Sequence, residues 1–325
     1  MGHLLSLWLP AAAGLIVGSR PARRLPARRA LATSTDERWP AWTESIEADA
    51  SLLYMPFLEH QLGVLERLGA VEEPSALEPR LSYAAKARAK GGLQARVGSR
   101  VFSVGGVFRR VRMTYFDGGH SLQVFNSLWC LFGVQCFVQS ARLGCTVAMP
   151  RYPALDRKDA PLLGIDLLRF GPKKFLCVVD AQPPAGRDPT DGSVPHDTSA
   201  LDAIRAAPGN DALRGEVSSK WYDDNRFFSN QMLYGRFQEG EAEVNDVLFP
   251  AFVDYLDAYV DLVSSAPLDP AHAEAARAGH ADYDVFNAAR DPAHGLFTSY
   301  FGEDWANDFV HDFLFESAPR TSAHE

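Results

Sequence analysis

The feature that most constrains this chain is a series of closely spaced β-rich runs in its middle third. Alternating apolar residues and β-branched residues predict strands at residues 99–104, 107–116, 121–128, 164–170 and 174–179. Most of these neighbours are joined by only a few residues, and such strands pair antiparallel because a parallel pair needs a crossover of about a dozen residues or more. The sequence therefore predicts an antiparallel meander.

Helical patterns flank this central series on both sides. Residues 39–69 carry leucines near a 3.6-residue period, and residues 243–263 carry a broad apolar stripe in which Pro250 is expected to kink or split the helix. Residues 183–210 are rich in Pro, Asp, Gly and Ser without periodicity, which predicts a surface loop. Helices before and after a sheet indicate an α/β fold, a three-layer α/β/α sandwich with a central antiparallel sheet.

Composition limits the class of protein further. With 325 residues, 46% of them hydrophobic and 22% charged, the chain has the makeup of a globular protein. Its formal net charge of −9 argues against general nucleic-acid binding, which needs a basic face. The cysteines are expected to be free thiols with no metal, because their spacing fits no common zinc or iron–sulfur pattern; they are Cys130, Cys136, Cys145 and Cys177.

Residues 1–33 have the pattern of a targeting segment. An apolar run from Leu4 to Val17 precedes five arginines, and no acidic residue occurs before Asp36. The run is too short and too interrupted by proline to predict a membrane span. A signal-like part followed by an arginine-rich part suits a two-part plastid address, and a plain secretory or mitochondrial signal is the alternative. The globular domain is expected at 34–318, followed by a tail at 319–325.

Several short motifs carry a resemblance to a known family. They are Pro-Leu-Leu-Gly-Ile-Asp at 161–166, Phe-Phe-Ser at 227–229, Asp-Pro-Ala-His-Gly-Leu-Phe at 291–297, Tyr-Phe-Gly-Glu-Asp-Trp at 300–305 and Asp-Phe-Leu-Phe at 312–315. In this order they resemble the ferredoxin-dependent bilin reductases, over roughly residues 39–315. The resemblance implies reduction of a linear tetrapyrrole without a bound metal or flavin. Electrons would come from reduced [2Fe-2S] ferredoxin, and carboxylates would supply protons.

Two aspartates fit that chemistry. Asp166 lies in an apolar run, where alternation places it on the face of a strand opposite Ile165 and Leu167. A carboxylate there is either paired or has a raised pKa, and the pattern alone leaves an ordinary salt-bridged residue open. Asp291 precedes Pro292, and this pattern by itself fits an ordinary turn or N-cap residue. The resemblance implies that Asp166 and Asp291 are the family's catalytic pair, on the sheet side and the helix side of the bilin.

Two further positions bear on the reaction. Asp117 closes a strand before Gly118 and Gly119, which is above all a turn signature, but some family members use an acid here and Asp117 is a third catalytic candidate. Asn126 stands where phycocyanobilin-forming members carry a histidine. An amide cannot donate its proton in acid catalysis, although it can hydrogen-bond a pyrrole N–H or a lactam oxygen, so Asn126 is assigned to substrate binding.

This departure argues against phycocyanobilin as product. With the neighbouring motifs, it favours a two-electron reduction of biliverdin IXα at the C15–C16 bridge to 15,16-dihydrobiliverdin. Three alternatives remain: a member that continues to phycoerythrobilin, a non-catalytic bilin-binding protein on the same fold, and a chlorophyll-catabolite reductase of related fold. A downstream bilin reductase is a further candidate partner; nucleic acid and membrane are not expected as partners.

Substrate contacts are expected around residues 226–236. Some of the cations here are expected to hold the bilin propionates, because guanidinium matches carboxylate geometry; solvated charges are the alternative. The proposed substrate-binding residues are Arg226, Phe228, Ser229 and Arg236.

Two basic clusters on neighbouring predicted strands or their ends are candidates for a ferredoxin-docking rim. A solvated sheet edge explains them nearly as well. The docking candidates are Arg109, Arg110, Lys173 and Lys174.

One segment departs from the family pattern. Residues 130–149 form a largely apolar insert where the family passes almost directly from the strand to a Tyr-Pro or Phe-Pro pair. A loop of this character would expose apolar surface. We interpret the insert as an intron read through in the gene model, with a genuine helical insertion or partner surface as the alternative.

Overall fold

The computed structural model describes residues 52–73, 78–87, 93–118, 122–131, 160–184, 186, 188, 190–191, 196–217, 225–266 and 273–320. The predicted targeting segment lies outside these residues, as do all of the insert except Cys130 and Leu131 and every cysteine except Cys130 and Cys177. No helix among the described residues is both long and apolar enough to cross a membrane.

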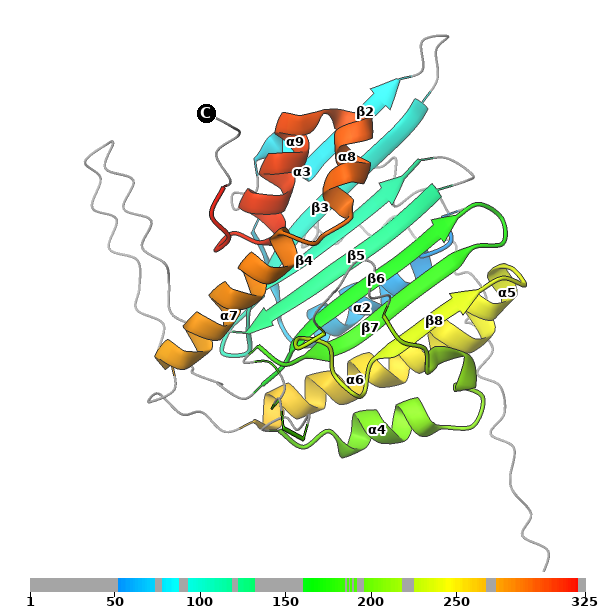
Figure 1. Ribbon diagram of the computed structural model, residues 1–325, viewed down its shortest axis with the longest axis vertical. Helices are drawn as coiled ribbons and strands as arrows, with labels where there is room; N and C mark the ends of the chain where they lie inside the picture. The colour runs from blue at the N-terminus through cyan, green and yellow to red at the C-terminus, as the bar shows by residue number, and fades with distance from the viewer. Residues whose placement is uncertain are drawn as a thin grey trace, which may run out of the picture. The chain divides into compact units, whose positions relative to one another are not determined.

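The centre of the fold is an eight-stranded antiparallel sheet (Figure 1). Its path runs β1-β3-β4-β5-β6-β7-β8, and β2 pairs with β3 off this path. The strands are β1 (Val71–Glu72), β2 (Tyr83–Ala87), β3 (Leu93–Val104), β4 (Phe108–Asp117), β5 (Leu122–Leu131), β6 (Leu162–Phe170), β7 (Phe175–Gln182) and β8 (Leu233–Phe237). From β3 to β8 each strand pairs with the next along the chain, which confirms the predicted meander and fold class.

One face of the sheet is sealed by three helices. They are α2 (Met55–Arg67), α4 (Ser199–Ala206) and α6 (Phe249–Ser265); in Figure 1 α2 lies behind the strands, and α4 lies beside α6 at the β8 edge. Their apolar stripes join odd-numbered strand residues such as Met113, Ile165 and Val179, each 0% exposed, in one large core. Because side chains alternate along a strand, the even-numbered neighbours of these residues face the opposite layer.

The opposite layer comes from the C-terminal quarter of the chain. Here α7 (Ala273–Ala288), α8 (Ala293–Phe301), α9 (Glu303–Asp308) and a π-helical segment (Phe309–Leu314) cover the β2–β4 side of the sheet in Figure 1. Phe116 of β4 packs edge-on against Phe297 and Tyr300 of α8, with ring centroids 5.7 and 5.0 Å apart. This layer has its own apolar core, separate from the first.

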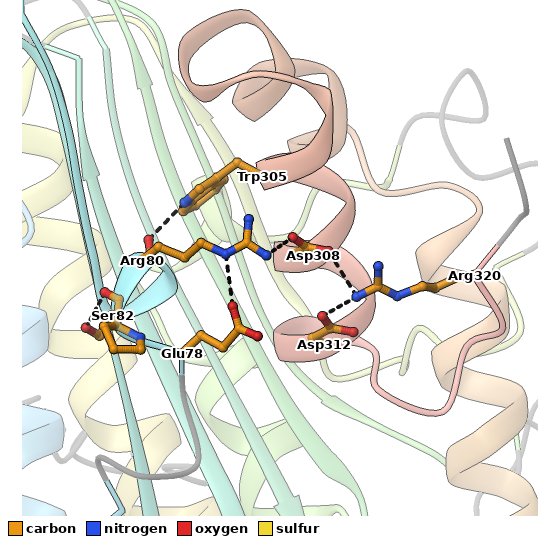
Figure 2. A network of polar contacts seen from close by, with 8 residues as sticks. Glu78, Arg80, Ser82, Trp305, Asp308, Asp312 and Arg320 are labelled. Atoms are coloured by element: carbon orange, nitrogen blue, oxygen red, sulfur yellow. Dashed lines mark hydrogen bonds and ion pairs between the residues drawn. The ribbon is translucent and has the colours of Figure 1, made fainter. Parts of the chain in front are cut away.

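A polar network fixes this layer to the sheet edge. Arg80, in the short helix α3 (Pro79–Ser82), pairs with Asp308 of α9, and Trp305 Nε1 donates to the carbonyl of Arg80 at 2.9 Å (Figure 2). Arg320 reaches back to the same Asp308 at 2.9 Å and to Asp312. Two arginines therefore converge on one carboxylate and hold both α3 and the C-terminal segment against α9.

Three local features differ in how well the sequence predicted them. The predicted break at Pro250 is confirmed, because a π-helical turn (Val244–Leu248) precedes α6 and the proline occupies its first turn, where the missing N–H costs nothing. The loop predicted at 183–210 is wrong in part, because it contains α4, whose Leu201 is completely buried. The short strands β1, β2 and β8 were not predicted.

Candidate active site

The sheet has one unusual face, on strands β6 and β7. On the helix-sealed side, Ile165 and Leu167 are 0% exposed. On the other side, the alternate residues in the middle of these strands are partly exposed, whereas Leu162, Asp180 and Gln182 at one end are buried. The partly exposed residues are Gly164, Asp166, Leu168, Leu176 and Val178. Phe228, Met232 and Tyr234 form a small apolar cluster with Leu176 and Val178 on this side. We call this surface the platform, and it is suited to a flat apolar ligand because such a ligand would complete its burial.

Asp166 lies on the platform in the middle of β6. It stands opposite Asn126 of β5 and Val178 of β7 in the strand register, and Asn126 stands opposite Thr114 of β4. Asn126 is thus the register partner of Asp166 on the neighbouring strand. Asp166 is partly exposed on this face.

Asp291 approaches Asp166 from the helix layer. It follows α7 directly, and its backbone N–H donates to the carbonyl of Asn287 at 2.8 Å. Its carboxylate accepts the backbone N–H of Ala293 at 2.7 Å, so the capping role predicted from Asp-Pro is present. Burial raises the pKa of Asp291 to about 7, and the negative charge of Asp166 acts in the same direction, against the bond from Ala293. Two carboxylates from opposite layers thus interact across the platform.

A hollow of about 520 Å³ opens at Asp291. It is lined by residues from the end of α7 and the start of α8, including Arg290, Pro292, His294 and Leu296. His294 Nε2 lies 2.8 Å from Asn307 Oδ1, so the histidine is held by α9, and no direct contact between His294 and Asp291 is found among the described residues. Asp291 is therefore partly exposed and borders this hollow.

The structure separates Asp117 from this pair. Asp117 is three residues beyond Thr114 on β4, so its side chain lies on the opposite face of the sheet from Asp166. Its carboxylate pairs with Arg96 of β3 at 2.9 Å, and both side chains are buried. Because the pair is on the wrong face and already neutralised, the geometry does not support Asp117 as a third proton donor.

The expected substrate contacts near residue 228 have different positions. Phe228 is a platform residue. Ser229 is committed elsewhere: its hydroxyl and its backbone N–H both donate to Asp180 of β7, at 2.5 and 3.0 Å. Arg226 pairs with Asp282 of α7 at 3.1 Å and lies over the rings of Phe227 and Phe286. Ser229 and Arg226 thus anchor the loop that carries Phe228.

Arg236 has a geometry that suits contact with an anion. It is exposed on β8, at the platform edge, and its Nε donates to the hydroxyl of Tyr234 at 2.9 Å. Its guanidinium also stacks over the ring of Tyr234 at 5.5 Å. A guanidinium held in this way keeps its terminal N–H groups available at the border of an apolar surface.

The two basic clusters do not form one rim. Arg109 and Arg110 are at the start of β4, beside the end of β5 and the start of β6, whereas Lys173 and Lys174 are in the β6–β7 hairpin at the other end of the sheet. Both arginines also pair with Glu316 of the C-terminal segment, with Arg109 at 3.3 Å. The lysines are exposed. The prediction of a single basic rim is therefore wrong, because strand order in sequence does not say at which end of a strand a charge lies.

Sequence patterns missed three platform-side residues. Asp180 of β7 is 0% exposed and accepts the two Ser229 bonds described above. Gln182 of β7 and Tyr283 of α7 are also buried, and the Tyr283 hydroxyl donates to Gln182 Oε1 at 2.5 Å. The one sequence signal was Gly164, since a glycine within a strand indicates close approach of another group.

Among the described residues, no group of three or more His, Cys, Asp or Glu side chains could hold a metal ion. Cys177 is a buried free thiol whose pKa burial raises to about 12, which disfavours the reactive thiolate at neutral pH.

Comparisons with known proteins agree on one family. The sequence model of the ferredoxin-dependent bilin reductases matches residues 146–316. Over 271 residues the chain is 37% identical to a 15,16-dihydrobiliverdin:ferredoxin oxidoreductase of Gloeobacter violaceus, covering 82% of this chain and 96% of that protein. Over 273 residues it is 36% identical to the protein of that name in Parasynechococcus marenigrum, covering 82% and 99%.

A solved structure with the same fold is phytochromobilin synthase from tomato, crystallised in complex with biliverdin. The TM-score is 0.60 with 18% sequence identity, and the match covers 83% of this chain and 85% of that one. At this identity the likeness supports the fold and leaves the details of the site to the residues themselves.

Proposed function

The chain belongs to the family of ferredoxin-dependent bilin reductases, and from this premise we propose that it reduces biliverdin IXα at the C15–C16 bridge to 15,16-dihydrobiliverdin. The net reaction takes two electrons from two molecules of reduced ferredoxin and two protons, which form one C–H bond at each of the two bridge carbons. The electrons come from the [2Fe-2S] cluster of the partner, and this chain contributes binding, orientation and protons.

One observation carries the proposal: Asp166 on the sheet and Asp291 on the helix layer interact across a partly exposed apolar platform. A flat tetrapyrrole lying on this platform has one carboxylate on the sheet side and one on the helix side. Its two bridge carbons can then receive protons from different residues. A protein that only carries bilin needs no such pair, so the arrangement favours reduction over carriage.

Asp291 is suited to proton donation by its environment. With a pKa of about 7, it holds its proton in about half of the molecules at neutral pH, which is the condition that favours general acid catalysis. A bound bilin would cover the hollow beside it and desolvate the carboxyl group further, which raises the pKa again. After each transfer the ionised carboxylate must take a proton from solvent, and the opening beside Asp291 gives water a route.

Contacts with substrate and partner follow from exposure. Arg236 at the platform edge is the candidate to bind a bilin propionate. Phe228, and Asn126 as the register partner of Asp166, would contact the bilin plane. Lys173 and Lys174 are the candidates for ferredoxin docking, because they are exposed on the hairpin that follows β6. An acidic partner docked there would lie at the hairpin end of the platform. Delivery to a plastid and transfer of the product to a downstream bilin reductase also remain proposals.

The test is an anaerobic assay with biliverdin, reduced ferredoxin and the full chain. The expected result is loss of the biliverdin absorbance and one product that co-elutes with 15,16-dihydrobiliverdin. Accumulation of phycoerythrobilin would replace the two-electron assignment with a four-electron one. Bound biliverdin that stays unchanged under reducing conditions would replace the enzyme with a bilin-binding protein.

A further inference from the structure

Gly164, two residues before Asp166 on the platform, leaves space that another side chain fills. A Cβ atom added at Gly164 would lie 2.7 Å from Gln182 Oε1 and 3.1 Å from Gln182 Cδ. Gln182 is on the neighbouring strand β7, where Leu162 is its register partner. Its side chain therefore crosses over β6 beside Asp166, and a Cβ atom at position 164 would force this side chain to move.

Gln182 connects the sheet to helix α7. Its Oε1 accepts the hydroxyl of Tyr283 at 2.5 Å, and the two residues are 6% and 4% exposed. The Tyr283 ring is held from the side by Phe227, with centroids 5.3 Å apart. A buried hydroxyl without an acceptor is destabilised by its full desolvation free energy. Movement of α7 that breaks this bond is therefore unfavourable, and the bond fixes the position of α7 over the sheet.

Helix α7 transmits that position to Asp291. Asn287 Nδ2 donates to the carbonyl of Tyr283 at 2.9 Å, and the Asp291 N–H donates to the carbonyl of Asn287 at 2.8 Å. Tyr283, Asn287 and Asp291 recur at intervals of four residues and so follow one side of the helix. A continuous set of contacts thus links Gly164, beside one catalytic carboxylate, to Asp291, the other.

We propose that Gln182 and Tyr283 are positioning residues that set the distance between the carboxylates of Asp166 and Asp291. The inference rests on the proposed function, because it assigns no chemistry to Gln182 or Tyr283 themselves. The Coulomb interaction of two carboxylates depends on their separation. The pair therefore controls how far Asp166 raises the proton affinity of Asp291.

Other charged groups face Asp291 and must be separated from this effect. Arg290, just after α7, and His294 of α8 line the same hollow, and the charge of Asp166 on β6 acts on Asp291. A pH–rate profile reports every ionisable group that affects the rate and does not isolate Asp291. The test therefore needs a measurement that reports carboxyl groups only.

The test is the Tyr283→Phe variant, which keeps the ring and removes the hydroxyl. Its Asp291 carboxyl is titrated by ¹³C NMR in protein labelled at aspartate, with Asp291→Asn to assign the signal. For carboxylates about 5 Å apart at an effective dielectric constant of about 20, a gain of about 1 Å lowers the pKa by about half a unit. The alkaline limb of kcat should move to lower pH by the same amount, with KM for biliverdin changed less than about twofold.

Gln182→Met keeps the volume and removes the acceptor, and should give the same shift. The double variant should shift no further than either single one, because both remove the same bond. The matched control is Tyr259→Phe, which removes a buried hydroxyl that donates to the Pro161 carbonyl in the other core and should leave the Asp291 titration unchanged.

The outcomes separate this inference from the proposed function. An unchanged Asp291 titration in a folded, biliverdin-binding Tyr283→Phe protein overturns the positioning role, even if Asp291→Asn is inactive. Additive shifts in the double variant overturn the shared bond. Full activity of Asp291→Asn overturns the role of Asp291 as proton donor, whatever Tyr283 does to its titration.

Discussion

At the scale of single residues, the function depends on the different surroundings of three aspartates. Asp117 is neutralised by Arg96 on the helix-sealed face, and Asp166 is partly exposed on the platform. Asp291 is capped by one backbone N–H at the border of the hollow. The sequence predicts Asp166 and Asp291 as the catalytic pair and keeps Asp117 as a third candidate. Their environments divide them into one structural residue and two candidates for proton donation.

Asp166→Asn should abolish the reaction while preserving the shape of the platform. Removing a general acid costs about 10²- to 10⁴-fold in rate, so we expect a rate loss in this range with biliverdin affinity changed less than about threefold. Because electron transfer does not need Asp166, a long-lived bilin radical should be visible by absorption and electron paramagnetic resonance. A turnover rate equal to that of the unmodified protein would contradict the assignment.

Asp117→Asn is the matched control, with the same chemical change on the other face. It weakens a buried ion pair, so we expect a melting temperature lower by about 2–6 °C. The rate should stay within about threefold of the unmodified protein at a temperature where both are folded. A loss as large as that of Asp166→Asn would return Asp117 to the catalytic set.

Asp291 predicts a pH dependence of stability. Its pKa is raised from 3.8 to about 7, so between these values the folded protein binds a proton that the unfolded chain has released. The contribution is fully present below about pH 4 and is lost as the pH rises through 7. Asp291→Asn removes this loss. We therefore expect the melting temperature of Asp291→Asn minus that of the unmodified protein to increase by about 2–5 °C between pH 5 and pH 8, measured by calorimetry. A melting-temperature difference that stays constant with pH would mean that the pKa of Asp291 is not raised in the folded protein.

At the scale of elements, the sequence predicts what depends on local pattern. Strands β3 to β7 alternate clearly and were placed within a few residues, except where β3 starts earlier at Leu93. Strand β8, Leu-Tyr-Gly-Arg-Phe, is five residues long with a central glycine, and such a run has too little alternation to be distinguished from a loop. Tyr283 and Gln182 are 101 residues apart, so no local pattern could join them.

The network around Asp308 tests how the C-terminal helices are held. Asp308→Asn weakens two ion pairs at a buried carboxylate whose arginine partners are about half exposed, so we expect a melting temperature lower by about 2–5 °C. Hydrogen exchange should increase in α9 and in α3 together, because Arg80 joins them. Arg67→Ala, which breaks the exposed pair with Asp257 on α6, is the control and should change neither. Faster exchange in α9 alone would contradict the link between α9 and α3 through Arg80.

At the scale of the whole molecule, the two layers have different tasks. The layer of α2, α4 and α6 seals one face of the sheet, whereas α7 to α9 cover only part of the other and leave the platform beside Asp291. The sequence could assign both layers to one sandwich but could not say which charges share an edge. That is why Arg109 and Lys174, adjacent in the argument from sequence, lie at opposite ends of the sheet.

Ferredoxin docking depends on how charge is distributed over the whole surface. The chain has a net charge of −9, so an acidic partner is repelled on average and must be attracted by a local patch. Lys173 and Lys174 are exposed, whereas Arg109 and Arg110 share Glu316. The hairpin should therefore dominate docking.

Lys174→Glu should raise the ferredoxin concentration for half-maximal rate by about three- to tenfold at low salt, since one reversed charge at a docking rim acts mainly on association. The difference should shrink near 0.5 M salt, where the Debye length is about 4 Å, and biliverdin affinity should not change. Arg67→Glu makes the same charge change on α2 and is the matched control. If both variants shift the ferredoxin dependence equally, only net charge matters. If Arg110→Glu alone shifts it, docking belongs to the other end of the sheet, and electrons enter the bilin from the side of Glu316.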